Sequence, residues 1–374
     1  MNSTSPRLLD FFAGSGLVSS GMDEICQTVW ANDICQQKGD FFQKNHPETQ
    51  FLLDSISNLK GQDLPEADIS WASFPCQDLS LAGNRGGLTS SRSGLFWEWL
   101  RLLDESPKRP RVLAIENVIG LVTSQGGEDY RQLQLSLEER GYRVGPMIIN
   151  AWHWVPQSRP RLFVVAVAKG IDTSAYESTF PNWLHSTPLQ RAFSTLPNTI
   201  FWNLPEVKAP RPALSDIIEW NAPVLPQEKT ERLLSLVPDN HVREIDNLPA
   251  NKQYVFPGYR RTRNGKQVLE LRFDGLAGCL RTAKGGSSRQ FLLIWNKGKW
   301  ESRLITTREA ARLMGAPESY SLSENYNESY NAMGDAVAVP VVQFLAKHLL
   351  APLAKLPLNS DVSSRKAPKF CLQP

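Results

Sequence analysis

Short apolar runs and amphipathic stretches alternate along the first 170 residues of the chain. A short apolar run that ends at glycine, proline or a polar residue predicts a buried strand, and apolar residues spaced three and four apart predict a helix. Alternation of the two predicts an α/β fold. The predicted strands cover 7–12, 28–33, 51–54, 67–72, 111–118, 142–150 and 162–168, and the predicted helices begin near Val18 and cover 36–45, 94–103 and 133–140.

The pattern changes near residue 170, where proline and tryptophan become frequent and periodicity fades. This change predicts a second, smaller and irregular domain. Regular helices return over 306–314, with Thr306 or Thr307 as N-cap, and over 341–350. We therefore predict one domain of residues 1–178 plus 328–374 and another of residues 179–327.

Composition narrows the class of protein. Apolar residues make up 41% of the chain and charged residues 21%, with a net charge of +3, which is typical of a globular protein outside membranes. The N-terminus lacks the layout of a signal peptide, so we expect a cytoplasmic protein. The five cysteines lack paired spacing and the five histidines do not cluster, which argues against a metal enzyme.

Basic residues concentrate between Asn251 and Arg303, where twelve Lys and Arg accompany three acids. Aromatic residues such as Tyr259 and Phe273 are interleaved with them. This composition suits a nucleic-acid backbone with bases nearby, and it equally suits a solvated charged surface.

The first predicted strand runs into Gly14-Ser15-Gly16, the kind of loop that lets a backbone approach a ligand closely. It lacks the third glycine of a dinucleotide fingerprint and the Lys-Ser/Thr of a P-loop, so another adenosine-bearing cofactor fits better. Asp33 ends the second strand, where an acid binds ribose hydroxyls or caps a helix. Asp54 ends the third and could receive an adenine amino group. Together they predict one cofactor groove.

Cys76 follows the fourth strand and Glu116 ends the fifth. A lone cysteine is most often a small buried apolar residue, and a carboxylate that ends a buried strand is costly unless it is paired or used. Arg159 and Arg161 alternate, so in an extended segment both would project to one face. The glycine-, serine- and arginine-rich stretch 79–93 predicts a basic lid.

In this order, the motifs resemble those of the DNA (cytosine-5)-methyltransferases of the bacterial restriction-modification or orphan type. The matching segments are Asp10-Phe11-Phe12-Ala13-Gly14-Ser15-Gly16, Phe74-Pro75-Cys76-Gln77, Glu116-Asn117-Val118, Gln157-Ser158-Arg159-Pro160-Arg161 and Gly334-Asp335-Ala336-Val337. Each is a weak pattern alone, but five in order over most of the chain are specific.

The resemblance implies a Rossmann-like methyltransferase domain with a smaller target-recognition domain at 179–327. It implies that Cys76 adds to carbon 6 of a flipped-out cytosine, and that carbon 5 then accepts the methyl group of S-adenosylmethionine, leaving S-adenosylhomocysteine. Glu116 would hold a proton at ring nitrogen 3 of the cytosine, and Asn117 would help to position the Glu116 side chain. Arg159 and Arg161 would supply positive charge near the cytosine and Cys76. The implied catalytic residues are Cys76, Glu116, Arg159 and Arg161; those at the cofactor are Asp10, Phe12, Ala13, Gly14, Ser15, Gly16, Leu17, Asp33, Ile34, Asp54, Ser55, Pro75, Leu95, Asp335, Ala336 and Val337; those at nucleic acid are Gln77, Ser80, Arg92, Asn117, Arg281, Thr282, Gly285 and Gly286.

The implied partner is double-stranded DNA. The resemblance implies a monomeric protein that is associated with the bacterial nucleoid and binds neither a metal nor a membrane. A cognate restriction endonuclease would be a separate protein. An RNA (tRNA) cytosine-5 methyltransferase and a catalytically silent DNA-binding relative are the alternatives. Two departures from the family pattern stand out. Asp335 replaces a more usual Asn and puts the cofactor contacts there in question, and Ser158 with Pro160 weakens the assignment of Arg161.

Overall fold

The structure, a computed structural model, describes residues 5–75, 94–249, 251–282, 289–296 and 298–358. The chain divides into two compact units. Unit 1 comprises residues 1–149, 160–207 and 341–374, and unit 2 comprises residues 150–159 and 208–340. The assignment of residues 179–327 to target recognition is a statement about function and stays a prediction.

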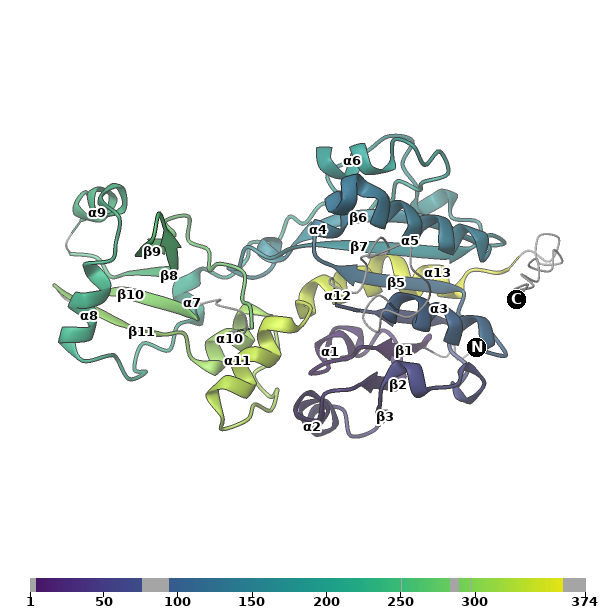
Figure 1. Ribbon diagram of the computed structural model, residues 1–374, viewed down its shortest axis with the longest axis horizontal. Helices are drawn as coiled ribbons and strands as arrows, with labels where there is room; N and C mark the ends of the chain where they lie inside the picture. The colour runs from purple at the N-terminus through teal and green to yellow at the C-terminus, as the bar shows by residue number, and fades with distance from the viewer. Residues whose placement is uncertain (1–4, 76–93, 250, 283–288, 297, 359–374) are drawn as a thin grey trace. The chain divides into compact units, whose positions relative to one another are not determined.

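Unit 1 is built on a seven-stranded sheet of order β3-β2-β1-β4-β5-β7-β6 (Figure 1). β1 through β5 pair in parallel, and β7 runs antiparallel to β5. The strands are β1 Arg7–Phe11, β2 Gln27–Asp33, β3 Gln50–Leu53, β4 Ile69–Ala72, β5 Val112–Asn117, β6 Tyr142–Asn150 and β7 Pro160–Ala168. The strand order reverses between β1 and β4, and in open α/β sheets ligands bind outside the carboxyl ends of strands at such a point. The predicted α/β, Rossmann-like fold is confirmed.

The helices of unit 1 bury their apolar faces against this sheet. Leu100 of α3 and Leu133 of α5 share one core with Leu9, Leu113 and Val164 of the strands. The helices are α1 Leu17–Met22, α2 Gln36–Asn45, α3 Leu95–Glu105, α4 Gly120–Thr123, α5 Glu128–Glu139, α6 Thr187–Phe193, α12 Val339–Leu345, a π-turn Ala346–Leu350 and α13 Ala351–Lys355, with 3-10 turns at Ile56–Asn58, Gly61–Asp63, Ser124–Gly127, Ala151–His153 and Ser174–Tyr176. The stretch Tyr326–Lys355 is long and apolar enough to cross a membrane, but most of its apolar window is buried inside the protein, as in a core helix.

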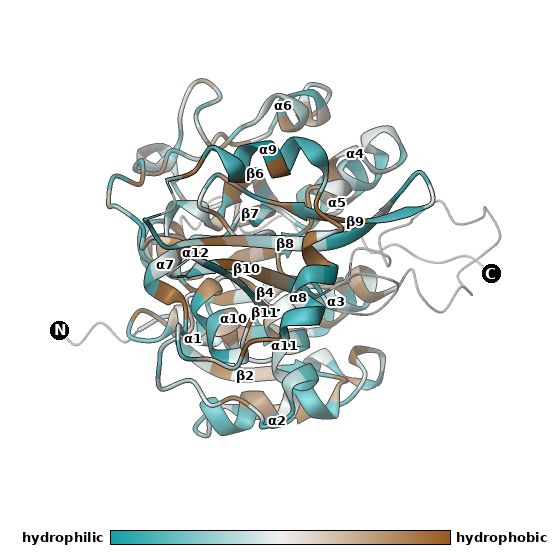
Figure 2. Ribbon diagram, turned by 90° about the vertical axis from the view of Figure 1, so that its left-hand side faces the viewer, coloured by the Kyte–Doolittle hydropathy of each residue, from teal (hydrophilic) through white to brown (hydrophobic). Residues whose placement is uncertain are grey.

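Unit 2 contains a four-stranded antiparallel sheet of order β11-β10-β8-β9, although the sequence pattern predicts an irregular domain. Its strands are β8 Tyr254–Arg263, β9 Lys266–Leu271, β10 Gln290–Asn296 and β11 Lys299–Leu304, and its helices are α7 Leu214–Ile217, α8 Gln227–Leu234, α9 Asp239–Asp246, α10 Thr307–Leu313 and α11 Tyr326–Asp335. Figure 2 shows apolar residues along β10 and polar ones at the end of the β8–β9 hairpin. The hairpin turns at Asn264-Gly265, both with positive φ, and this dipeptide is the local signal that could have revealed it.

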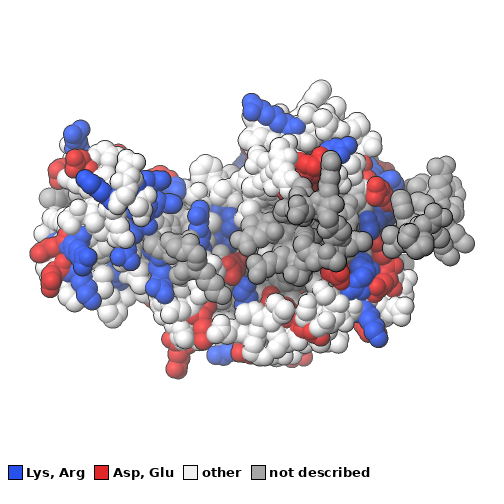
Figure 3. Space-filling view, in the orientation of Figure 1, with Lys and Arg blue, Asp and Glu red and all other residues white. Residues whose placement is uncertain are grey.

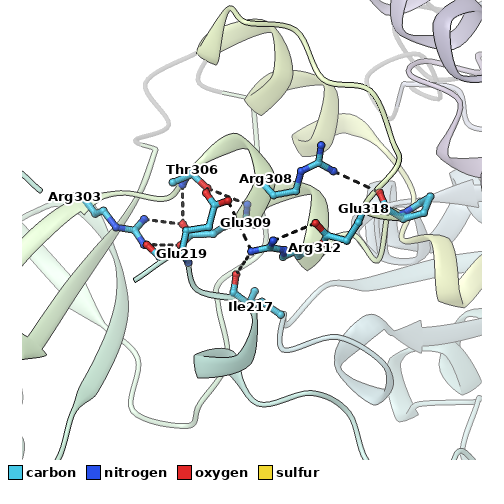
Figure 4. Close-up of polar contacts among 9 residues, drawn as sticks. Ile217, Glu219, Arg303, Thr306, Arg308, Glu309, Arg312 and Glu318 are labelled. Carbon is cyan, nitrogen blue, oxygen red and sulfur yellow. Dashed lines mark hydrogen bonds and ion pairs between the residues drawn. The ribbon is translucent and has the colours of Figure 1, made fainter. Parts of the chain in front are cut away.

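A buried ion pair fixes the junction between β11 and α10 (Figure 4). The Arg303 guanidinium donates to both Glu309 carboxylate oxygens, at 2.7 and 2.5 Å, and neither side chain is more than 4% exposed. Thr306 accepts from the Glu309 N–H and Glu309 accepts from the Thr306 N–H, so the predicted N-cap is confirmed as a capping box. Thr306 also donates to Glu219 at 2.6 Å, which joins this junction to the segment that follows α7.

Candidate functional site

The loop between β1 and α1 curls over the end of β2. Phe12, Gly14 and Gly16 all have positive φ, at 58°, 56° and 84°. The Ala13 N–H donates to the Asn32 carbonyl and the Gly14 N–H donates to Asp33 Oδ2, each at 2.9 Å. Left-handed backbone favours glycine, which explains why glycines follow the first strand. The predicted glycine loop and Asp33 therefore meet at one sheet edge.

His46, which follows α2, supports this loop and has no counterpart among the predicted site residues. Its Nε2 donates to the Gly16 carbonyl at 2.9 Å and lies 3.1 Å from Ser20 Oγ. A Cβ on Gly16 would meet the His46 ring at 2.7 Å, so only glycine fits. Burial lowers the pKa of His46, which favours the neutral ring. A single histidine at the polar end of a helix such as α2 gives no sign in the sequence that it supports a glycine loop.

The ends of β2 and β3 are joined by Asn32. Its Nδ2 donates to the carbonyls of Leu52 and Asp54, each at 2.9 Å. Asp54 Oδ1 in turn accepts from the Ser55 N–H and from Asn58 Nδ2, both at 2.7 Å. Ile34, the residue after Asp33, is 72% exposed and presents a large apolar surface at the end of β2. The edge thus offers polar groups and an apolar face together.

Asp10 lies fully buried in β1, below the glycine loop. Its Oδ2 accepts from Ser19 Oγ at 3.0 Å, whereas its Oδ1 has no hydrogen-bond partner in the described part of the chain. Burial raises its pKa to about 7, the Ser19 donor lowers it, and the nearby charge of Asp33 raises it further. A buried carboxylate oxygen without a donor is costly, and a cationic or N–H group of a ligand would relieve that cost.

The raised pKa of Asp10 predicts a pH dependence of stability. The folded state holds this proton from pH 3.8 to about 7 whereas the unfolded state does not, so the stabilisation is present below pH 3.8 and is lost as pH rises through about 7. We expect the group to contribute roughly 4 kcal/mol across that range. Chemical unfolding at several pH values should show this loss in the parent protein and its absence in Asp10→Asn. Parallel profiles for the two proteins would contradict the assignment.

Glu116, at the end of β5, pairs with Arg161 at the start of β7. Arg161 Nε lies 3.0 Å from Glu116 Oε1, and the side chains are 16% and 10% exposed. In the antiparallel register Glu116 faces Phe163, so Arg161 is its diagonal neighbour on the same face. The two side chains form a nearly buried ion pair at this end of the sheet. The structure thus brings together two of the predicted catalytic residues.

Arg159 has different partners. It is 2% exposed, and its guanidinium donates to the carbonyls of Leu280, Gly334 and Ala336, all within unit 2. Arg161, two residues later, pairs with Glu116 of unit 1, and the expectation that Arg159 and Arg161 project to one face stays a prediction. Alternation in sequence sets the direction of side chains only inside a regular strand, and β7 begins at Pro160.

Asn117 ties the end of β5 to the end of β4. It is 3% exposed, its Nδ2 donates to the Phe74 carbonyl at 3.0 Å, and its Oδ1 accepts from the Val118 N–H at 2.9 Å. Both ends of the amide are therefore used inside the chain. This position favours an internal tie over the predicted nucleic-acid contact. Phe74 lies two residues before Cys76, so the tie fixes where that segment leaves the sheet.

Replacing Asn117 with Ala should therefore weaken both stability and activity. We expect the free energy of unfolding to fall by about 1–3 kcal/mol, because the Phe74 carbonyl loses its donor in a buried place. We also expect kcat to fall about tenfold or more, since the following segment is less well oriented. Denaturant unfolding and steady-state methyl transfer measure the two effects. Unchanged kcat with lowered stability would show that the tie serves the fold alone.

The remaining predicted residues divide into described and undescribed ones. Cys76, Gln77, Ser80, Arg92, Gly285, Gly286 and the predicted lid lie outside the described residues. Among described positions, Pro75, Arg281 and Asp335 are exposed, Ser15, Leu17 and Val337 are buried, and Leu95, Thr282 and Ala336 are half-buried. Among the described ranges no group of three His, Cys, Asp or Glu could hold a metal ion.

Unit 2 presents a basic surface on the β8–β9 hairpin. Figure 3 shows Lys and Arg side chains gathered over its strands. Arg261 and Arg263 both pair with Glu270, at 2.8 and 2.6 Å, which holds them on one face of the hairpin. Arg260 lies on the other face, with its guanidinium 5.1 Å from the Phe291 ring centre. The cations outnumber the acid here, as at surfaces that meet phosphates.

Comparisons with known proteins agree over nearly the full length. The family model described as "C-5 cytosine-specific DNA methylase" matches residues 7–351. The chain is 28% identical to the type II methyltransferase M.NgoFVII of Neisseria gonorrhoeae, over 93% of this chain and 87% of that protein. It is 24% identical to the type II methyltransferase M.HhaI of Haemophilus parahaemolyticus, over 92% and 94%. Among solved structures, the fold resembles a methyltransferase of Entamoeba histolytica with a TM-score of 0.65 and 14% sequence identity, over 94% of this chain and 99% of that chain. It also resembles the Dnmt2 methyltransferase of S. pombe with a TM-score of 0.59 and 20% sequence identity, over 93% of this chain and 99% of that chain.

Proposed function

This chain belongs to the C-5 cytosine-specific DNA methylase family and is a DNA cytosine-5 methyltransferase, and from that premise we propose how its residues divide the work. The methyl donor is bound at the carboxyl ends of β1, β2 and β3. The target cytosine is flipped out of the duplex and meets Cys76, Glu116 and Arg161. The observation that supports this proposal most strongly is the ion pair between Glu116 and Arg161, at 3.0 Å. Glu116 ends β5, which pairs with β4, the strand that precedes Cys76 in the sequence.

The residues at the first sheet edge fit S-adenosylmethionine. Its sulfonium and ammonium groups are cationic, and the buried Asp10 oxygen without a donor suits such a partner. Asp33 would accept from the ribose hydroxyls and Asp54 from the adenine amino group, with Ile34 against the adenine face. A Cβ on Gly14 would meet no atom closer than 3.9 Å, so the loop surface is open there. When bound, the group supplies an electrophilic methyl carbon. The family-based assignment of Asp335, Ala336 and Val337 to the cofactor stays a prediction.

The chemistry at the base requires a nucleophile because carbon 5 of cytosine is not reactive enough alone. We propose that the Cys76 thiolate bonds to carbon 6 and that the ring electrons move to carbon 5, which takes the methyl group. A base then removes the carbon-5 proton, the carbon–sulfur bond breaks, and the thiolate returns. Glu116 contacts ring nitrogen 3 and the amino group, and Arg161 orients Glu116 and stabilises charge that develops on the ring.

Unit 2 supports a duplex DNA substrate. Its antiparallel sheet carries a basic hairpin, and side chains there can set the register on phosphates while others read base edges. The type II methyltransferases among the relatives support action at one short DNA sequence. We further propose that the protein acts as a monomer at the nucleoid and that any cognate endonuclease is a separate protein. Methylation of tRNA is the second candidate function. It would use the same residues at the ends of the unit 1 strands for the cofactor and for the cytosine.

Bisulfite sequencing of DNA from cells that express the protein tests the proposal. We expect complete protection of one cytosine within one short motif, absent from cells with an empty vector. A labelled-methyl assay with duplex DNA and with bulk tRNA separates the two substrates. Transfer to tRNA alone would overturn the DNA assignment for this chain.

A further inference from the structure

The Arg159 guanidinium forms a clamp between two distant segments of unit 2. Nη1 donates to the Leu280 carbonyl at 2.9 Å, and Nη2 donates to the carbonyls of Gly334 and Ala336 at 3.0 and 2.5 Å. The side chain is 2% exposed. A planar guanidinium offers donors in fixed, diverging directions, so one side chain can hold carbonyls of separate segments.

The two segments also touch directly. A Cβ on Gly334 would lie 2.7 Å from the Arg281 carbonyl carbon and 2.8 Å from the Thr282 nitrogen, so glycine is required for their approach. Gln157, two residues before Arg159, accepts from the Leu280 N–H at 2.9 Å and donates to the Leu313 carbonyl at 2.7 Å. Residues 157–159 thus fix Leu280 through both its N–H and its carbonyl.

We propose that Arg159 is a positioning residue that holds Arg281 and Thr282 in the place where they meet DNA. This inference rests on the proposed function and on the family resemblance, which implies that Arg281 and Thr282 contact nucleic acid. Arg159 acts through the backbone of that segment and does not touch the reacting base. The catalytic arginine of the motif is Arg161, whose guanidinium pairs with Glu116.

The two assignments predict different kinetics. Loss of the clamp frees the segment that we propose to contact DNA, so KM for DNA should rise by a larger factor than kcat falls when DNA and S-adenosylmethionine are both saturating. Loss of Arg161 should lower kcat with bound DNA in place. The split between KM and kcat therefore separates positioning from catalysis.

The test compares Arg159→Lys and Gly334→Ala with the parent protein. Lysine keeps the charge but has no diverging donors, and the alanine methyl group pushes the same segments apart without changing charge. We expect both variants to raise KM for DNA about tenfold and to leave kcat within about threefold. The yield of covalent complex with saturating 5-fluorocytosine duplex should also be unchanged.

Arg303→Lys is the matched control, because Arg303 is the buried arginine that holds Glu309 instead of the Leu280–Thr282 segment. It should lower the melting temperature without raising KM for DNA. A fall in kcat at unchanged KM in Arg159→Lys, or an equal rise of KM in Arg303→Lys, would overturn the clamp. If the parent enzyme is active on DNA, either of these results leaves the proposed function standing. A parent protein that is inactive on DNA would overturn both the proposed function and the proposed role of Arg159.

Discussion

Cys76→Ser is expected to lose methyl transfer by about 10⁴-fold or more. The serine hydroxyl has far too high a pKa to add to carbon 6 as an anion, whereas a thiol reaches its thiolate form near neutral pH. Binding of the methyl donor should change little, because the proposed contacts come from the strand ends at Gly14, Asp33 and Asp54. A labelled-methyl assay measures transfer, and calorimetric titration with S-adenosylhomocysteine measures binding.

Covalent trapping sharpens this result. A duplex with 5-fluorocytosine at the target should hold the parent enzyme in a complex that survives a denaturing gel, because fluorine cannot leave as the proton does. Cys76→Ser should form none. Cys26→Ala is the control, since burial raises the pKa of Cys26 to about 12 and keeps it an inert thiol. Loss of the complex in the Cys26 variant, or its survival in the Cys76 variant, would count against the assignment.

Arg161→Ala is expected to lower kcat by about 10²- to 10³-fold, the size seen when one electrostatic contact to a developing charge is removed. The same change should reduce the free energy of unfolding by about 3 kcal/mol, because the nearly buried Glu116 loses its counter-ion. Single-turnover transfer at saturating DNA and cofactor isolates the first effect. Denaturant unfolding measures the second.

A double variant separates stability from chemistry at this pair. Glu116→Gln with Arg161→Ala removes both charges, so part of the lost free energy of unfolding should return. Methyl transfer should stay slow, because the target cytosine still lacks the Glu116 carboxylate and the Arg161 guanidinium. Recovery of kcat in the double variant would show that Arg161 serves only to neutralise Glu116.

The helical and strand periods were strong enough to predict the elements of unit 1 closely. α2 and β6 occupy the predicted ranges 36–45 and 142–150, since their ends are marked by polar residues and turns. In unit 2 the strand β8 was missed because its sequence lacks the alternation typical of a strand. β8 ends in four exposed residues, Arg260 to Arg263, and carries Pro257-Gly258 in its middle, so alternation is lost.

The sequence by itself determined the family and the class of reaction, because five motifs in order specify which residue types stand at the strand ends. Tertiary structure alone decided which neighbours those residues contact. It assigned Arg161 to Glu116 and Arg159 to the carbonyls of Leu280, Gly334 and Ala336. It also revealed His46 beneath the glycine loop. The physical reason is that hydrogen bonds and burial depend on neighbours brought together from distant segments, and local spacing carries no information about which neighbours these are.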